Sequence, residues 1–592
     1  MYVLGIACYF HDSAAALLSD GALVAAAEEE RFTRKKHDFD FPEHAIDFCL
    51  KTAGIEGPDL DAVVFFEKPF VKFERLLMTS LQSFPRSHKV FREAMLTWMG
   101  DKLWIKSLIQ KRLKIPSARI LFSEHHLSHA ASAFFCSPFE EAAILTIDGV
   151  GEWTTAAIGV GRGTDIKLVK EIRFPHSLGL LYSAFTAFLG FEVNEGEYKV
   201  MGMAPFGTPR YVDKVMKLIR LDNDGGFELD MDYFSFCDST EKTFNQRFVD
   251  LFGIPRDAKS HFFTPSTGYP SYFGSKPGNY DELGRLNQHY ADIAASIQAV
   301  TEEVMVRMAQ EAYRQSGLKN LCMAGGVALN SVGNSKILAK VPFEQIYIQP
   351  AAGDGGGALG AALYGYHSVL SRPRSLVLNH AYWGEQHCSS KIESFLSESN
   401  IPYEHFDNEG ELIGRVVDAL QSGKVVGWSQ GRFEWGPRAL GNRSILADPR
   451  RPEMKDIVNT KIKFREPYRP FAPSVLAERA DEYFNLNGAS GQYPTRFMLY
   501  VMGVKPDKQH LLPAVTHVDG TSRLQTVHRE VSPRYYELVK QFGEATGVPV
   551  LLNTSFNLKG EPIVNTPREA FRTFSMSDMD ILVLENCLVR KT

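Results

Sequence analysis

The sequence is poor in cysteine and has no long apolar run. Its 592 residues include seven cysteines, an odd number, and none of them forms a Cys-x-x-Cys pair. This pattern speaks against a disulfide framework or a zinc ribbon and suits buried, reduced thiols. The longest apolar stretch, residues 178–191, is shorter than the roughly 20 residues that span a bilayer. The N-terminus also lacks the basic region of a signal peptide. We therefore expect a cytoplasmic protein without a membrane partner.

An excess of basic charge is also missing. Lys and Arg total 65 and Asp and Glu total 70, so the net charge is -5. Nucleic-acid-binding proteins usually carry a basic excess, and we expect no nucleic-acid partner. With 44% hydrophobic and 12% aromatic residues, the chain has enough apolar side chains for a sizeable core. The sequence makes no prediction of oligomeric state.

A strand–turn–strand pattern occurs twice in the first part of the chain. Residues 2–7 and 14–18 are strand-like and flank a turn that contains His11 and Asp12. Residues 143–147 and 154–160 are also strand-like and flank Asp148-Gly149-Val150-Gly151. The recurrence predicts an internal duplication of an α/β unit. Turns of this kind place backbone N–H groups and a carboxylate where a phosphate or a metal could bind.

Two glycine-rich turns follow later strands. An apolar periodicity predicts a helix from Asp292 that ends near Gly317. The strand-like segment 321–324 then leads into Gly325-Gly326, with Asn330 shortly after, and the segment 345–348 leads to Gly353-Asp354-Gly355. Glycines between a strand and a helix let a nucleotide approach the backbone, although each turn alone could be only a tight turn. Their succession in a duplicated frame favours nucleotide binding.

The composition changes between about residues 366 and 388. We expect a first domain over residues 1–370, with a weakly patterned insertion or lid at 221–288. The second domain, over residues 386–592, alternates strand-like and helical segments and is predicted to be α/β as well.

His125 and His129 are four residues apart and would share one face of a helix. Such a pair suits two ligands of one transition metal, although by itself it more often consists of surface or core histidines. Asp148 and Asp354 add carboxylates at positions where α/β proteins place ligands. A site of two histidines and two aspartates would suit Fe(II), Mn(II) or Zn(II).

His11 is a natural proton acceptor for an alcohol, with a turn histidine beside an Asp cap as the plainer alternative. The run from Glu28 to Lys36 is most simply an exposed charged segment, with a role at the mouth of the substrate site as the less favoured alternative.

A dense cationic cluster is predicted in the second domain. Its arginines and lysine are interleaved with Pro, Gly and aromatic residues, which favours a fixed cleft over a solvated charged face. Guanidinium and ammonium groups that converge in one place recognise phosphate or carboxylate. The cluster contains Arg438 and Arg443, then Lys461, Lys463, Arg465 and Arg469, and is followed later by Arg523 and the polar run 553–557.

Several long motifs, in this order, closely resemble the bacterial O-carbamoyltransferases of the tobramycin, cephamycin and Nod-factor type. They include residues 5–15, 28–32, the His125/His129 pair, 148–152, 196–205, 436–443 and 553–557. The resemblance covers nearly the whole chain. It implies a duplicated actin-like ATPase-fold N-terminal domain and a YrdC-like α/β C-terminal domain.

The same resemblance implies roles for individual residues. The metal ligands would be His125, His129, Asp148 and Asp354, with iron as the family's metal. His11 would act as base or orienting group, and Lys463 would be catalytic in the second domain. Carbamoyl phosphate would be held by Arg438, Lys463, Arg465, Arg523, Asn553 and Ser555. The nucleotide, ATP with Mg(II), would lie near Asp12, Gly149, Gly325, Gly326, Asn330, Gly353 and Gly355.

We therefore expect an ATP-dependent O-carbamoyltransferase of secondary metabolism, such as antibiotic biosynthesis. It would convert carbamoyl phosphate and ATP to carbamoyl-adenylate and carbamoylate a hydroxyl of a small-molecule acceptor. One alternative is a fused tRNA threonylcarbamoylation enzyme, against which the net charge of -5 weighs. The other is a non-catalytic actin-like ATP switch, which would have no use for the histidine pair.

Overall fold

The computed structural model describes residues 1–100, 102–239 and 241–591, and divides into two compact units. The first unit comprises residues 1–24, 39–42 and 49–377. The second comprises residues 378–592 together with residues 25–38 and 43–48. Two short segments near the N-terminus thus belong to the unit formed by the C-terminal part of the chain.

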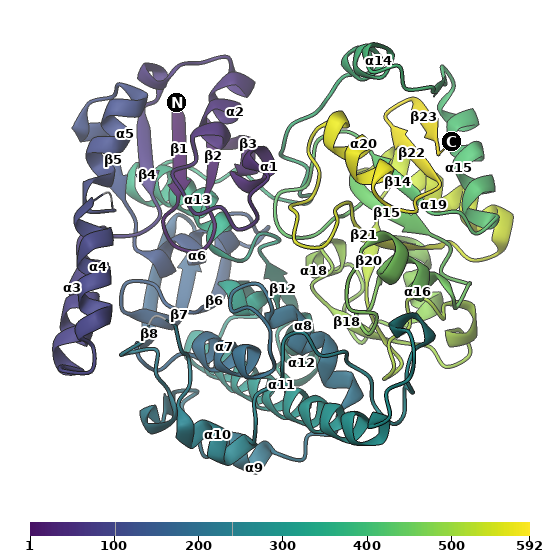
Figure 1. Ribbon diagram of the computed structural model, residues 1–592. Helices are drawn as coiled ribbons and strands as arrows, with labels where there is room; N and C mark the ends of the chain where they lie inside the picture. The colour runs from purple at the N-terminus through teal and green to yellow at the C-terminus, as the bar shows by residue number, and fades with distance from the viewer. Residues whose placement is uncertain (101, 240, 592) are drawn as a thin grey trace. The chain divides into compact units, whose positions relative to one another are not determined.

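Two five-stranded sheets of one plan form the first unit (Figure 1). The first has the order β3 (Ala22–Glu28), β2 (Ala14–Ser19), β1 (Tyr2–Ala7), β4 (Ala62–Phe65) and β5 (Ile120–Phe122). The second has the order β8 (Asp165–Arg173), β7 (Thr154–Arg162), β6 (Glu141–Ile147), β11 (Asn320–Ala324) and β12 (Gln345–Ile348). In each sheet the central strand pairs antiparallel with the strand that follows it and parallel with a later one. The predicted duplicated α/β fold class is confirmed.

Two helices carry the site and pack closely on each other. They are α6 (His125–Phe134) and α13 (Asp354–Leu363), and α13 also packs on β1. The close approach depends on glycine: a Cβ at Gly360 would overlap the carbonyl oxygen of Ser128, and one at Gly5 would overlap that of Ala358. The sequence thus keeps small residues where the helices and strands of this unit meet.

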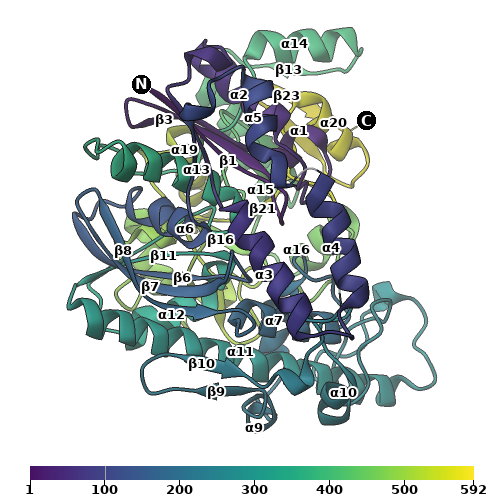
Figure 2. The same cartoon turned by 90° about the vertical axis from the view of Figure 1, so that its left-hand side faces the viewer.

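The remaining helices of the first unit include a long one that begins earlier than predicted. Helix α11 extends over Tyr280–Ser316 rather than from Asp292, and Gly317 ends it in the left-handed conformation. The first turns of this helix are mostly polar, so the periodicity of apolar residues does not extend to them and did not predict them. Figure 2 shows α3 and α4 in front of the other elements of this unit. The other helices are α3 (Pro69–Gln82), α4 (His88–Gly100), α5 (Ile105–Leu113), α7 (Leu178–Phe188), α8 (Glu197–Met203), α9 (Val212–Val215), α10 (Gln246–Phe252) and α12 (Ser331–Lys340).

The second unit is built around an eight-stranded mixed sheet. Its order is β13 (Glu404–His405), β23 (Cys587–Arg590), β22 (Ile581–Leu584), β14 (Val426–Ser429), β15 (Arg443–Ala447), β21 (Val550–Ser555), β16 (Ala472–Leu476) and β20 (Gln525–Val527). Helices α15 (Glu409–Gln421) and α19 (Pro533–Thr546) pack on each other and contribute apolar side chains to its core. A smaller sheet contains β17 (Phe484–Asn485), β18 (Val501–Val504) and β19 (Thr521–Arg523).

The segment Glu28–Lys36 is not the exposed charged face that we predicted from its composition. Glu28, Glu29 and Arg31 are buried. Glu28 accepts the N–H of Gly436 at 2.7 Å, and Arg31 donates to the carbonyl of Gly436 at 2.7 Å. These partners are remote in sequence. The charged side chains of Glu28 and Arg31 therefore form hydrogen bonds inside the second unit instead of facing solvent.

Among the described helices, none has the length and apolar character needed to cross a bilayer.

Candidate metal centre and anion site

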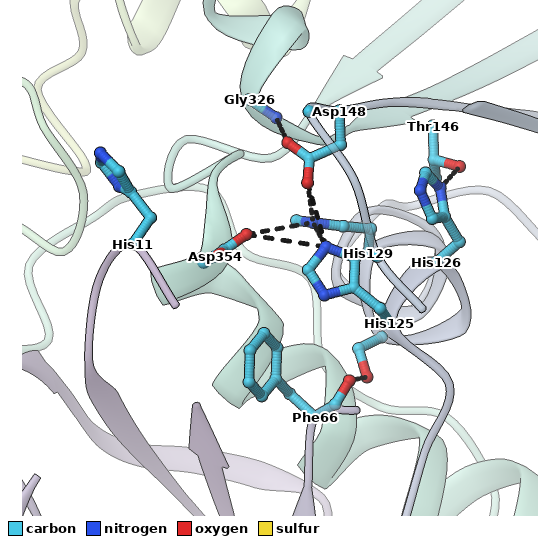
Figure 3. Close-up of polar contacts among 12 residues, drawn as sticks. His11, Phe66, His125, His126, His129, Thr146, Asp148, Gly326 and Asp354 are labelled. Carbon is cyan, nitrogen blue, oxygen red and sulfur yellow. Dashed lines mark hydrogen bonds and ion pairs between the residues drawn. The ribbon is translucent and has the colours of Figure 1, made fainter. Parts of the chain in front are cut away.

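Helix α6 presents two imidazoles on one buried face, as the spacing predicts. The Nε2 atoms of His125 and His129 are 3.1 Å apart, and both residues are at most 1% exposed. His126 points away and its Nδ1 is 2.8 Å from the hydroxyl of Thr146 (Figure 3). Burial and the two neighbouring imidazoles hold the pKa of His126 well below its usual value. His126 therefore stays neutral and belongs to the packing of the helix.

Two carboxylates complete the group. Asp148 directly follows β6, and Asp354 is the first residue of α13. The Oδ2 of Asp148 lies 3.0 Å from Nε2 of His125, and the Oδ1 of Asp354 lies 3.7 Å from the Nε2 atoms of both histidines. Gly326 donates its N–H to the other oxygen of Asp148 at 2.8 Å, which fixes that carboxylate. The structure thus brings together the four residues predicted as metal ligands, with donor atoms within 4.8 Å of one another.

The two shorter separations among these donors, 3.0 Å for Asp148–His125 and 3.1 Å for His125–His129, fit one divalent ion, whereas Asp354, at 3.7 Å from both histidines, would move slightly inward to join them. Two ligand atoms each about 2.1 Å from an ion, at angles of 90–110°, lie about 3.0–3.4 Å apart. Oδ2 of Asp354 is buried and has no hydrogen-bond donor within the described residues, which leaves a lone pair for a cation. Burial would raise the pKa of Asp148, but the two histidines hold it well below its usual value. Two nitrogen and two oxygen donors do not single out the predicted Fe(II) over manganese or zinc.

His11 lies outside this donor set, at the end of the first strand–turn unit (Figure 3). Its Nδ1 is 2.8 Å from a carboxylate oxygen of Asp12, and its Nε2 is 2.7 Å from the carbonyl oxygen of Asn194. Burial would lower the pKa of His11, but the charge and hydrogen bond of Asp12 raise it to about 10. Both ring nitrogens therefore donate, so in this arrangement His11 is a held cation and not a free base.

The predicted nucleotide residues occupy the turns expected for them. Gly325 and Gly326 follow β11, and Gly325 has a positive φ of 94°. Gly353 is the N-cap of α13 and Gly355 lies in its first turn, while Asn330 caps α12 with its side chain. A Cβ at Gly149 or Gly353 would meet no atom within 4 Å, so the space beside these two turns is open.

The second unit gathers cations around Lys463. The Lys463 ammonium is buried and donates to the carbonyl oxygens of Ser555 and Asn557 at 2.6 and 2.9 Å and to the Ser555 hydroxyl at 3.1 Å. Burial and the nearby positive charges of Arg465, Arg469 and Lys36 hold its pKa well below the usual value. A bound anion would offset the positive charges around Lys463 and so stabilise its protonated form.

Arg523 stands in the same cluster. Burial, together with the charges of Arg438, Arg465 and Arg469, holds its pKa well below the usual value. Its Nε atom is buried without an acceptor in the part of the chain that the structure describes. The four cations predicted for the anion site, Arg438, Lys463, Arg465 and Arg523, are thus electrostatic neighbours, and a bound anion would relieve their repulsion.

Asn553, the fifth of the predicted residues, is buried inside the second unit and not exposed at its surface. It is 1% exposed, and its amide donates to the hydroxyl of Ser474 at 3.1 Å and to Gln525 at 2.9 Å. Its Oδ1 is buried and has no donor among the residues described. Asn553 therefore offers one unused acceptor within β21, two residues before Ser555 at the end of that strand.

A family-wide profile described as "Carbamoyltransferase N-terminus" matches residues 2–363, and one described as "Carbamoyltransferase C-terminus" matches residues 417–591. The chain belongs to the carbamoyltransferase family. Its relatives include the "Uncharacterized protein sll1178" of Synechocystis sp., with 47% identity over 100% of this chain and 97% of that protein. They also include the "Nodulation protein NolNO" of Sinorhizobium fredii, with 38% identity over 98% of this chain and 79% of that protein.

Solved structures resemble this carbamoyltransferase only weakly. HypF of T. kodakarensis is 15% identical over 62% of this chain and 48% of its own, with a TM-score of 0.31. A likeness of this size carries no argument, and the fold assignment rests on the strand order of the two sheets.

One cation of this carbamoyltransferase's anion cluster, Lys36, is missing from the sequence-based prediction, whereas Arg469 belongs to the predicted cationic run. Lys36 comes from the N-terminal segment of the second unit. No signal in the sequence connects it with this cluster, because only the fold brings it near Lys463.

Proposed function

We propose that this carbamoyltransferase uses ATP to convert carbamoyl phosphate to carbamoyl-adenylate and then carbamoylates a hydroxyl of a sugar or secondary metabolite. The observation that carries the proposal is the buried cationic cluster around Lys463, Arg523 and Ser555 in the second unit. A small dianion is the type of ligand that such a cluster binds.

Carbamoyl phosphate offers two groups that match this cluster. Its phosphate would be held by the guanidinium groups of Arg438, Arg465 and Arg523. Its carbamoyl NH₂ group is a donor, and Oδ1 of Asn553 is a buried acceptor without a donor among the described residues. Formation of the adenylate consumes one water and releases phosphate from carbamoyl phosphate and pyrophosphate from ATP. Mg(II) would accompany the ATP.

The first unit would carry out the transfer. When bound, a divalent ion held by His125, His129, Asp148 and Asp354 would polarise the carbamoyl group and neutralise phosphate charge. The hydroxyl oxygen of the acceptor forms the new bond to the carbamoyl carbon, AMP leaves with the electron pair of the bond that breaks, and the proton of the hydroxyl is released to solvent.

The held cation His11 can orient the carbamoyl group and stabilise negative charge that develops on it. To accept the proton of the alcohol, it must first lose one of its contacts to Asp12 or Asn194. The geometry thus favours the orienting role over that of a free base.

Two substitutions separate the half-reactions. In Lys463→Ala we expect loss of the carbamoyl phosphate-dependent exchange of pyrophosphate into ATP. His11→Asn should retain this exchange but form no carbamate ester with a panel of hydroxylated metabolites and labelled carbamoyl phosphate. Lys461→Ala, which removes an exposed lysine two residues from Lys463, is the matched control.

Loss of both steps in His11→Asn would refute this division of labour. Threonine- and bicarbonate-dependent modification of tRNA, without any carbamate ester, would instead favour the threonylcarbamoylation alternative.

A further inference from the structure

A buried ion pair lies directly behind the candidate metal centre. Glu67 stands between β4 and α3, and its Oε2 accepts from the Lys72 ammonium at 2.6 Å. Both side chains are only 4% exposed. Taking two charges out of water costs free energy that their mutual attraction often does not recover. A gain in stability therefore does not explain why this ion pair is buried, and we look for a role in the neighbouring site.

The pair faces the ring of His125 on the side away from the donor group. Nε2 of His125 points to Asp148 and Asp354, so its Nδ1 is the outer nitrogen of the ring. Oε2 of Glu67 is 3.9 Å from this Nδ1 and is the carboxylate oxygen nearest to it in the ion pairs of the site. Nδ1 itself is buried and has no hydrogen-bond partner in the described parts of the chain.

The backbone around Glu67 is tied to the start of α6. Glu152 accepts the N–H of His125 at 3.1 Å and the N–H of Lys68 at 2.8 Å. Arg75, one turn beyond Lys72 in α3, donates to the carbonyl of Gly151 at 3.1 Å. These contacts fix the turn that carries Glu67 relative to the helix that carries His125. Oε2 of Glu67 and Nδ1 of His125 would reach hydrogen-bond distance if they moved about 0.7 Å closer together.

Metal-bound histidines usually donate their second ring N–H to a carboxylate, a carbonyl or a water. Such a partner fixes the tautomer, so that the lone pair of the ligating nitrogen faces the ion, and it raises the basicity of the ring. Glu67 occupies the place of this partner for His125, and the Lys72 ammonium, 2.6 Å from its Oε2, holds the carboxylate in position.

We propose that Glu67 is a positioning residue for the metal ligand His125: it accepts the Nδ1–H when the metal binds and is itself held by Lys72. The inference rests on the metal site of the proposed function. Glu67 takes no part in binding carbamoyl phosphate or ATP and acts only through His125.

The test measures metal binding rather than turnover. The affinities of wild type and variants for Co(II) are determined by competition with a chromophoric chelator, together with the Co(II) d–d absorption spectrum. In Glu67→Ala we expect a 10- to 100-fold loss of affinity and an altered spectrum. Glu67→Gln keeps an acceptor without the charge and should recover part of the affinity.

Glu124→Gln is the matched control. Glu124 is adjacent to His125 in sequence and pairs with Lys68 at 2.7 Å, but this pair is exposed. Its Co(II) affinity should stay within about twofold of wild type. Lys72→Met tests the inference independently of changes at Glu67, because it leaves the carboxylate without its cation and should also weaken binding.

Three results are distinguishable. If wild type binds no Co(II), or His125→Ala binds it as well as wild type does, the metal site itself is refuted. If His125→Ala abolishes binding while folded Glu67→Ala keeps the wild-type affinity and spectrum, the role of Glu67 alone is refuted. If folded Lys72→Met binds like wild type, Lys72 does not hold Glu67 for this purpose, and the proposal also fails.

Discussion

Replacing Arg523 by glutamine should stabilise the protein in the absence of anions and abolish its response to carbamoyl phosphate. Arg523 is partly buried, and the charges of Arg438, Arg465 and Arg469 oppose its protonation. Glutamine removes the charge but keeps much of the side-chain length. The substitution therefore relieves repulsion in the free protein and removes one of the groups that would hold the phosphate.

The two effects have different sizes. Two like charges 8 Å apart repel by about 2 kcal/mol at an effective dielectric constant near 20. Since salt screens part of this repulsion and the variant loses some packing, we expect a net gain of about 1–2 kcal/mol. In wild type, carbamoyl phosphate at about 100 times its Kd should stabilise the protein by about 2.7 kcal/mol. One kcal/mol corresponds to roughly 2–4 °C in Tm for a domain of about 200 residues.

The assay is thermal unfolding of the whole chain at low salt, with and without carbamoyl phosphate. Arg479→Gln is the control: Arg479 forms an ion pair with Glu482 in which both side chains are nearly half exposed. It should change stability by less than about 1 kcal/mol and leave the anion response intact. The reasoning is refuted if Arg523→Gln is less stable than wild type without anion, or if it still responds to carbamoyl phosphate as wild type does.

Three further predictions concern the first unit. Removal of the tightly bound divalent metal with a chelator, followed by dialysis into buffer with Mg(II), should abolish carbamate formation but leave carbamoyl phosphate-dependent pyrophosphate exchange intact, as measured with labelled pyrophosphate; loss of both activities would place the metal elsewhere. Because the pKa of His11 is raised from 6.5 to about 10, its stabilising contribution is complete below pH 6.5 and disappears as the pH rises to about 10; the Tm difference between wild type and His11→Asn should shrink over that window, and a constant difference would contradict this pKa. Gly360→Ala should push α13 away from the carbonyl of Ser128 and reduce metal stoichiometry, whereas Gly414→Ala, in α15 with open space around it, should be neutral or stabilising by up to about 1 kcal/mol; equal effects in the two variants would refute the argument.

The sequence predicts the placement of the four residues of the candidate metal centre because local rules decide it. Four-residue spacing puts His125 and His129 on one helical face, and Asp148 directly follows a strand. The position of Asp354 at the start of a helix follows from the glycine-rich turn that precedes it. Each of these positions depends on the geometry of a single element or of one strand end, which a short stretch of sequence contains.

Contacts between remote segments could not be predicted in this way. Glu28 and Arg31 look like a solvated charged run, yet their hydrogen-bond partner Gly436 is about 400 residues away. Glu67 and Lys72 form no recognisable motif, and only the fold of the turn after β4, which Glu152 ties to the start of α6, places Glu67 behind His125. The local sequence does not reveal that a charged residue is buried when its partner comes from another part of the chain.

The two candidate sites have opposite electrostatic requirements, and this contrast is the strongest structural argument for two successive steps. In the first unit, the carboxylates of Asp148 and Asp354 converge on two imidazoles, an arrangement that a divalent cation completes. In the second unit, the buried Lys463 and the partly buried Arg523 lie beside further cations, so the pKa values of both fall and a bound anion would offset the repulsion. Without a ligand, neither arrangement stabilises the folded protein, because each places like charges close together or leaves buried polar atoms without hydrogen bonds. A single chain that maintains both is therefore suited to charged substrates and a metal at once, as the formation and use of a carbamoyl-adenylate would require.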